Sequence, residues 1–81
     1  MPVFKFKTRL RFIGENGSMG LTHGQIYMAT VSYGAPYIWV RWKWNEGERP
    51  TSDRAADCCP YASIAALGHN WELASIQNGG N

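Results

Sequence analysis

Residues 3–13 read VFKFKTRLRFI, a stretch in which apolar and mostly basic side chains alternate. Side chains change face at every residue of a β-strand, so this period of two predicts a strand with one buried face and one exposed face. The side chains assigned to the buried face are Phe4, Phe6, Leu10 and Phe12. The side chains assigned to the exposed face are Lys5, Lys7, Arg9 and Arg11.

The same alternation returns in residues 38–44, which read IWVRWKW. The face expected to be buried carries Ile38, Val40, Trp42 and Trp44, although the side of Trp44 stays open because it ends the strand. The face expected to be exposed carries Trp39, Arg41 and Lys43. Six of the eight lysines and arginines therefore fall on the exposed faces of two strands. Because neighbouring cations repel each other, one shared basic surface would favour an anionic partner.

Further elements follow from the composition of the remaining segments. Other strands are expected in residues 25–33, at Cys58 and Cys59 before Pro60, and in residues 71–76. Glycines in residues 14–24 supply the positive φ angles that tight turns need. Ser63 is expected to cap a short helix that ends at Gly68, and a single helical turn is expected in residues 51–57.

Short strands, glycine-rich turns and one short helix predict an all-β fold, a small closed or half-closed antiparallel barrel. A chain of 81 residues is long enough for one domain, which we assign to residues 1–76. Both faces of the strand at 25–33 carry apolar side chains, so it is expected to be covered on both sides. Residues 77–81 contain nothing to bury and are expected to be disordered.

The two cysteines, Cys58 and Cys59, are adjacent, and a disulfide between neighbouring residues is strained. We therefore expect both thiols to be reduced, with one packed as a small hydrophobe, which implies a cytosolic setting. No apolar run approaches the roughly 20 residues that span a bilayer, so no membrane association is expected.

Catalytic and metal-binding patterns are weak in this sequence. Zinc ligands are usually spaced two to four residues apart, whereas Cys58 and Cys59 would point in opposite directions, and His23 and His69 lie elsewhere in the sequence. The acidic residues are scattered, and no glycine-rich phosphate loop opens a helix. We expect no enzyme activity, no metal, no cofactor and no small-molecule substrate.

Several short motifs point to a family. They are RFIG at residues 11–14, GSMGL at 17–21, GQIY at 24–27, IWV at 38–40, CPYAS at 59–63 and NWE at 70–72. Together they resemble a family of small phage and prophage proteins with SH3-like barrels, over about residues 9–73. The resemblance implies an SH3-like barrel and a place among the accessory proteins that phages use against host systems. Residues 41–57 are longer and more charged than is usual in that family.

Three interpretations of the basic surface remain open. It could dock on an acidic surface of a host protein or nucleoprotein complex, as an anti-defence, anti-CRISPR-like inhibitor in the host cytosol would. It could bind single-stranded DNA or RNA, with Trp39 stacking on a base. It could also be a solvated face whose charges pair with Glu46, Glu48 or Asp53.

Because the organised charge is positive, the chain is not expected to imitate DNA. The residues assigned to partner binding are Lys5, Lys7, Arg9, Arg11, Trp39, Arg41 and Lys43. The loop at residues 45–57 is the second choice, because exposed loops on rigid barrels often carry recognition.

Overall fold

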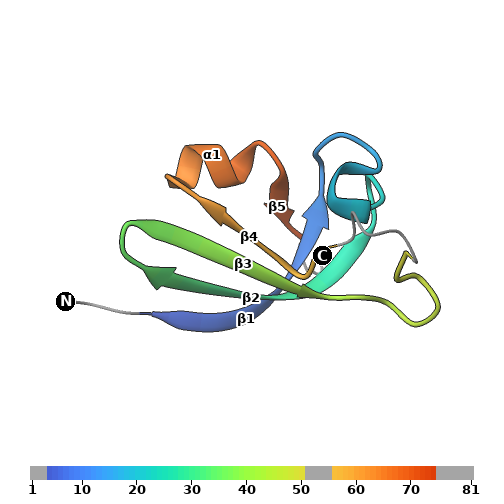
Figure 1. Cartoon of the computed structure of the whole chain (residues 1–81), viewed down its shortest axis with the longest axis horizontal. Helices are drawn as coiled ribbons and strands as arrows, with labels where there is room; N and C mark the ends of the chain where they lie inside the picture. Colours follow the sequence, from blue (N-terminus) through green and yellow to red (C-terminus); the bar gives the residue numbers. More distant parts are fainter. Residues whose placement is uncertain (1–3, 51–55, 75–81) are drawn as a thin grey trace, which may run out of the picture.

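The computed structural model describes residues 4–50 and 56–74. Within these residues the strands are β1 (Lys5–Phe12), β2 (Ile26–Gly34), β3 (Tyr37–Lys43), β4 (Cys58–Tyr61) and β5 (Trp71–Leu73). They form one antiparallel sheet in the order β4-β3-β2-β1-β5. The sheet curls into a half-barrel, and a short helix, α1 (Ile64–Gly68), joins the two edge strands (Figure 1). The fold is therefore all-β, as expected, and consistent with a small SH3-like barrel.

Local sequence explains most of these bounds. β2 and β3 begin and end within one residue of the segments predicted for them, residues 25–33 and 38–44. Alternation of apolar and polar side chains marks a half-buried strand. The Oγ of Ser63 accepts a hydrogen bond from the N–H of Ala66 at 3.1 Å, which is the expected helix cap. β4 continues one residue past Pro60 to Tyr61.

Some of the expected elements are not covered by the structure. The helical turn expected in residues 51–57 and the tail at residues 77–81 lie largely or wholly outside the described residues. β5 ends at Leu73, and residues 75–81 lie outside the description. Among the described residues, no helix combines the length and the apolar character needed to cross a bilayer.

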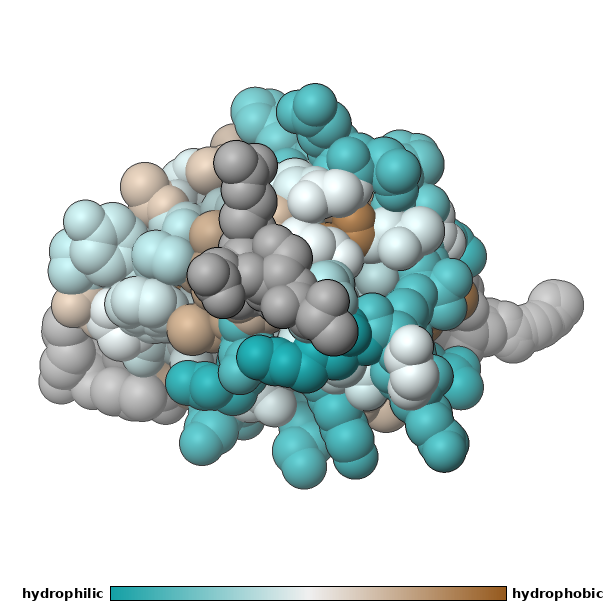
Figure 2. All heavy atoms as spheres, turned by 45° about the vertical axis from the view of Figure 1, so that its right-hand side comes forward, coloured by the Kyte–Doolittle hydropathy of each residue, from teal (hydrophilic) through white to brown (hydrophobic). Residues whose placement is uncertain are grey.

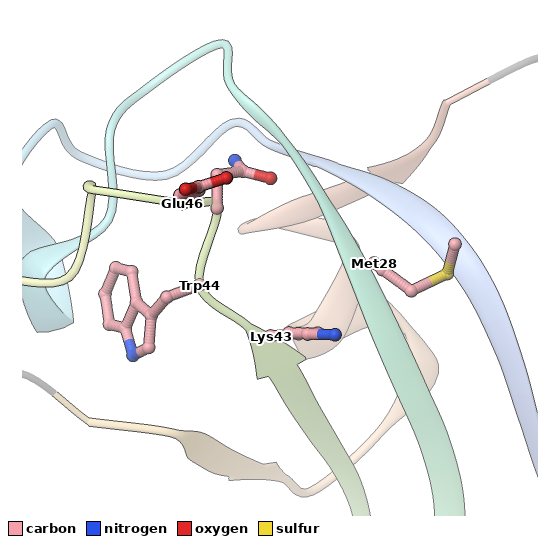
Figure 3. Close-up of a pocket in the computed structure, with 5 residues that line it drawn as sticks. Met28, Lys43, Trp44 and Glu46 are labelled. Atoms are coloured by element: carbon pink, nitrogen blue, oxygen red, sulfur yellow. The ribbon is translucent and has the colours of Figure 1, made fainter.

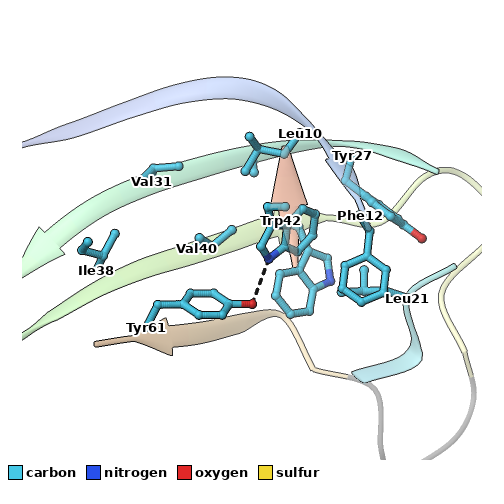
Figure 4. Close-up of a cluster of buried hydrophobic side chains, with 11 residues drawn as sticks. Leu10, Phe12, Leu21, Tyr27, Val31, Ile38, Val40, Trp42 and Tyr61 are labelled. Atoms are coloured by element: carbon cyan, nitrogen blue, oxygen red, sulfur yellow. Dashed lines mark hydrogen bonds between the residues drawn. The ribbon is translucent and has the colours of Figure 1, made fainter. Parts of the chain in front are cut away.

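The core fills the concave face of the sheet (Figure 4). Trp42 and Trp71 are both buried there, as predicted from their phase along the strands. Their rings pack with centroids 5.6 Å apart, and the Phe12 ring meets Trp71 edge-on at 5.2 Å. The hydroxyl of Tyr61 accepts a hydrogen bond from the Nε1–H of Trp71 at 2.9 Å. Large aromatic side chains thus form a substantial part of the core of this small domain.

The turn between β1 and β2 depends on a close approach at Gly14. A Cβ at Gly14 would lie 2.7 Å from both the Phe12 ring and the Oδ1 of Asn70, which is too close for two non-bonded atoms. Only glycine therefore fits here without a shift of its neighbours. The carbonyl oxygen of Gly14 also lies 2.8 Å from the Nδ1 of His23. A short 3-10 helix, η1 (Ser18–Gly20), follows within the turn. These contacts fix the end of β1 and hence its register with β2.

The prediction that Phe4 and Phe6 are buried is wrong. Phe4 is 43% exposed and Phe6 is 49% exposed, whereas Leu10 and Phe12 on the same face are buried. The alternation along β1 is correct, but the barrel is open. β5 pairs with β1 only from Leu10 to Phe12, so the first half of β1 has no neighbouring strand on that side among the described residues, and Phe6 faces an open groove.

Candidate binding surface

The strand register places all the predicted binding residues on the outer, convex face of the sheet. Lys5 pairs with Ser32 of β2, which pairs with Trp39 of β3. The next rows of the same face are Lys7, Thr30 and Arg41, then Arg9, Met28 and Lys43. We define the basic face as Lys5, Lys7, Arg9, Arg11, Trp39, Arg41 and Lys43. Figure 2 shows hydrophilic side chains projecting side by side from the lower side of the molecule, where β1 to β3 lie in Figure 1.

Most cations of the basic face have no ionic partner within the described residues. Arg11 forms an ion pair with Glu72 at 2.8 Å. The other ion pair among these residues joins Arg49 to Asp57 at 2.8 Å. Glu48 accepts a hydrogen bond from Asn45 instead of pairing with a lysine. Neutralisation of the basic face by Glu46 or Glu48 is therefore not seen, and Asp53 lies outside the described residues.

A shallow groove of about 370 Å³ runs across the basic face. It is lined by Lys5, Lys7, Thr30, Ser32, Trp39, Arg41 and Cys58. Hydroxyl groups of β2 thus lie between cations of β1 and β3. Ammonium, guanidinium and hydroxyl groups all donate hydrogen bonds to carboxylate or phosphate oxygens. The groove is chemically suited to an anionic group.

Aromatic and apolar side chains share this face. Trp39 is 37% exposed, as expected, and the Tyr37 ring meets it edge-on with centroids 6.1 Å apart. Sequence reasoning did not select Tyr37, although it has the same parity as Trp39 along β3. Ile26 and Met28 are also exposed here. The expectation that β2 is covered on both sides is therefore wrong for the described residues, because the half-barrel leaves its convex face open.

The loop at residues 45–57, the second candidate for recognition, follows the end of β3. A hollow of about 420 Å³ lies there between Met28, Lys43, Trp44, Asn45 and Glu46. Figure 3 shows Lys43 pointing towards β2 and Met28, while Trp44 points to the opposite side of the strand. The hollow meets the basic face at Lys43, but it also holds a carboxylate.

Asp57 anchors the end of that loop. Its carboxylate accepts hydrogen bonds from Arg49 at 2.8 Å and from the Nε1–H of Trp44 at 3.0 Å. The hydrogen bond from Arg49, followed by that from Trp44, lowers the pKa of Asp57 below its ordinary value. Asp57 is thus hydrogen-bonded to Arg49 and Trp44, and the nearby charge of Arg41 on the basic face contributes a smaller lowering of its pKa.

The cysteines point to opposite sides of β4. Cys58 pairs with Arg41 and lines the groove on the basic face, whereas Cys59 pairs with Val40 and packs against the core. Both are half-buried free thiols. Within residues 4–50 and 56–74, no three histidine, cysteine or acidic side chains gather as metal ligands would.

Comparisons with protein-family models, curated proteins and solved structures find no match for this chain.

Proposed function

We propose that this chain is a non-enzymatic binding protein that docks through its basic face on an acidic surface of a host macromolecular complex. The observation that carries the proposal is a set of cations on either side of β2 that have no ionic partners among the described residues: Lys5, Lys7 and Arg9 on β1, and Arg41 and Lys43 on β3. Cations held side by side on a rigid sheet repel each other, and an anionic partner relieves that repulsion. The resemblance to phage accessory proteins supports the specific form of an anti-defence, anti-CRISPR-like inhibitor.

The mixture of side chains on this face favours a protein partner. Met28 is exposed between Arg9 and Lys43, and Tyr37 and Trp39 are exposed at the start of β3, before Arg41. Protein interfaces concentrate binding energy in aromatic anchors surrounded by polar groups, and aromatic residues, methionine and arginine are enriched in them. Trp39 is the anchor in this proposal, with Arg41 and Lys43 as its charged neighbours along β3.

A second candidate is a single-stranded nucleic-acid-binding module. It is favoured by the Tyr37–Trp39 pair, because exposed rings beside cations can stack on bases while the cations contact phosphates. The two candidates differ in their salt dependence. Affinity for a single strand should fall log-linearly with salt, with a slope of about −0.7 for each phosphate contacted.

The test uses the intact chain as bait in a bacterial lysate, with and without nuclease. The matched variants are Arg41→Glu on the basic face and Arg49→Glu on the loop, which change the net charge equally. We expect the chain to capture a protein whether or not nuclease is present. Arg49→Glu should still capture it, whereas the affinity of Arg41→Glu for it should be at least about tenfold weaker.

Two outcomes would contradict the proposal. Capture that disappears with nuclease would favour the nucleic-acid candidate. Equal loss with Arg41→Glu and Arg49→Glu would mean that net charge, rather than the basic face, controls binding.

A further inference from the structure

The first half of β1 has an unpaired edge within the described residues. β1 pairs with β2 from Lys5 to Arg11, but with β5 only from Leu10 to Phe12. The carbonyl oxygen of Phe4 accepts a hydrogen bond from Tyr33 of β2, and that of Arg9 accepts one from Ala74. Because backbone groups alternate in direction along an antiparallel strand, Lys5 and Lys7 turn their N–H and C=O groups to the unpaired edge. Such an edge is a template for a further strand.

An apolar groove lies beside the same edge on the concave side of the sheet. It has a volume of about 330 Å³ and runs between β1, α1 and β5. Its apolar walls include Phe6, Leu10, Val31, Ile64, Leu67 and Leu73. Ile64 and Leu73, which line this groove, are both 68% exposed. The groove is the open mouth of the half-barrel.

The two sides of this edge have opposite chemistry. Apolar Phe6 faces the groove, whereas Lys5, Lys7 and Arg9 face the convex side and belong to the basic face. A strand added here would place alternate side chains on the two sides. The matching segment is therefore extended, with apolar residues over the groove and acidic residues beside the lysines.

Other occupants fit less well. If β1 of a second copy paired here, lysines and arginines of the two copies would lie opposite one another, which is destabilising. Residues 75–81 of this chain read SIQNGGN and contain no acidic residue. They therefore offer no acidic side chain to the cations beside this edge.

We infer that the edge of β1 at residues 5–8 captures an extended partner segment in which acidic and apolar residues alternate. This inference rests on the proposed function, because it specifies how a protein partner meets the basic face. Main-chain hydrogen bonds to Lys5 and Lys7 supply part of the affinity, and the alternating side chains supply specificity.

The test titrates the full-length chain into a fluorescein-labelled short peptide in which glutamate and valine alternate. A peptide of the same composition with its glutamates and valines in two blocks is the control. We expect the alternating peptide to bind at least about tenfold more tightly than the block peptide. We also expect the amides of Lys5 and Lys7 to become protected from hydrogen exchange, because they become donors to the added strand.

Two substitutions of Lys7 separate charge from edge pairing. Lys7→Gln removes the charge alone, whereas Lys7→Pro also removes the N–H that points to the unpaired edge and leaves the β1–β2 ladder intact. Lys7→Pro should bind the peptide at least about tenfold more weakly than Lys7→Gln. If Lys7→Pro does not fold, Leu73→Ser at the exposed wall of the groove replaces it and should weaken binding severalfold.

Equal affinity for the alternating and block peptides, or no binding of either, would overturn the inference. Equal weakening by Lys7→Gln and Lys7→Pro, or no effect of Leu73→Ser where it is used, would overturn it as well. None of these results bears on the Arg41→Glu and Arg49→Glu comparison, so the proposed function can stand or fall separately.

Discussion

Tyr61 shows how much of this interior depends on one oxygen atom. Its hydroxyl accepts hydrogen bonds from the Nε1–H of Trp71 and from the Nδ2–H of Asn70. Burial raises the pKa of this hydroxyl above its ordinary value of 10.0. The oxygen therefore joins β4 to β5 across the open side of the half-barrel, where the two strands do not pair.

We predict that Tyr61→Phe lowers the free energy of unfolding by about 1–3 kcal/mol, because the buried N–H of Trp71 loses its acceptor. The pH dependence gives a second readout. A raised pKa in the folded state means that the stability is present below pH 10 and is lost as pH rises through that pKa. Denaturant unfolding should show a gap between the native protein and Tyr61→Phe that is constant below pH 10 and narrows as the pH rises above it. A gap that widens over this range would contradict the assignment.

At the scale of elements, the two halves of β1 have different surroundings. Its second half lies between β2 and β5, and its first half is paired with β2 alone. Phe12 is fully buried in one half and Phe6 is 49% exposed in the other. The same alternating pattern thus supports the core at one end and leaves aromatic rings exposed at the other.

A matched pair of substitutions tests this division. Phe12→Ala should lower the free energy of unfolding by about 3–5 kcal/mol, because it leaves a cavity in the core. Phe6→Ala should lower it by less than about 1 kcal/mol, because the ring is half exposed already. Thermal or denaturant unfolding of both variants measures the difference. Equal losses would mean that the first half of β1 is covered.

The sequence predicted those features of the fold that depend on residues close together in the chain. Alternation located β2, β3 and the basic face, and Ser63 marked the start of α1, because these features depend on residues near one another in the chain. The exposure of Phe4 and Phe6 could not be predicted in this way. A period of two tells which side chains share a face, but whether another element covers that face depends on where β5 stops pairing.

At the scale of the whole molecule, the open half-barrel separates two surfaces that meet along β1. The convex side carries the basic face, and the concave side carries the apolar groove. A closed barrel would have no such groove and no unpaired edge. Tyr37 and Met28 enter the convex surface only through the register of three strands, which explains why sequence reasoning passed over them.

The lysines of the chain allow a direct test of the central claim. They are Lys5, Lys7 and Lys43, and all of them belong to the basic face. The measurement is mass-spectrometric footprinting with an amine-acetylating reagent, on the free chain and on its complex with the captured host component. We predict that all three lysines react more slowly in the complex, by about tenfold, because their ammonium groups face the partner. A complex that stays intact while Lys5, Lys7 and Lys43 react as fast as in the free chain would contradict docking through the basic face.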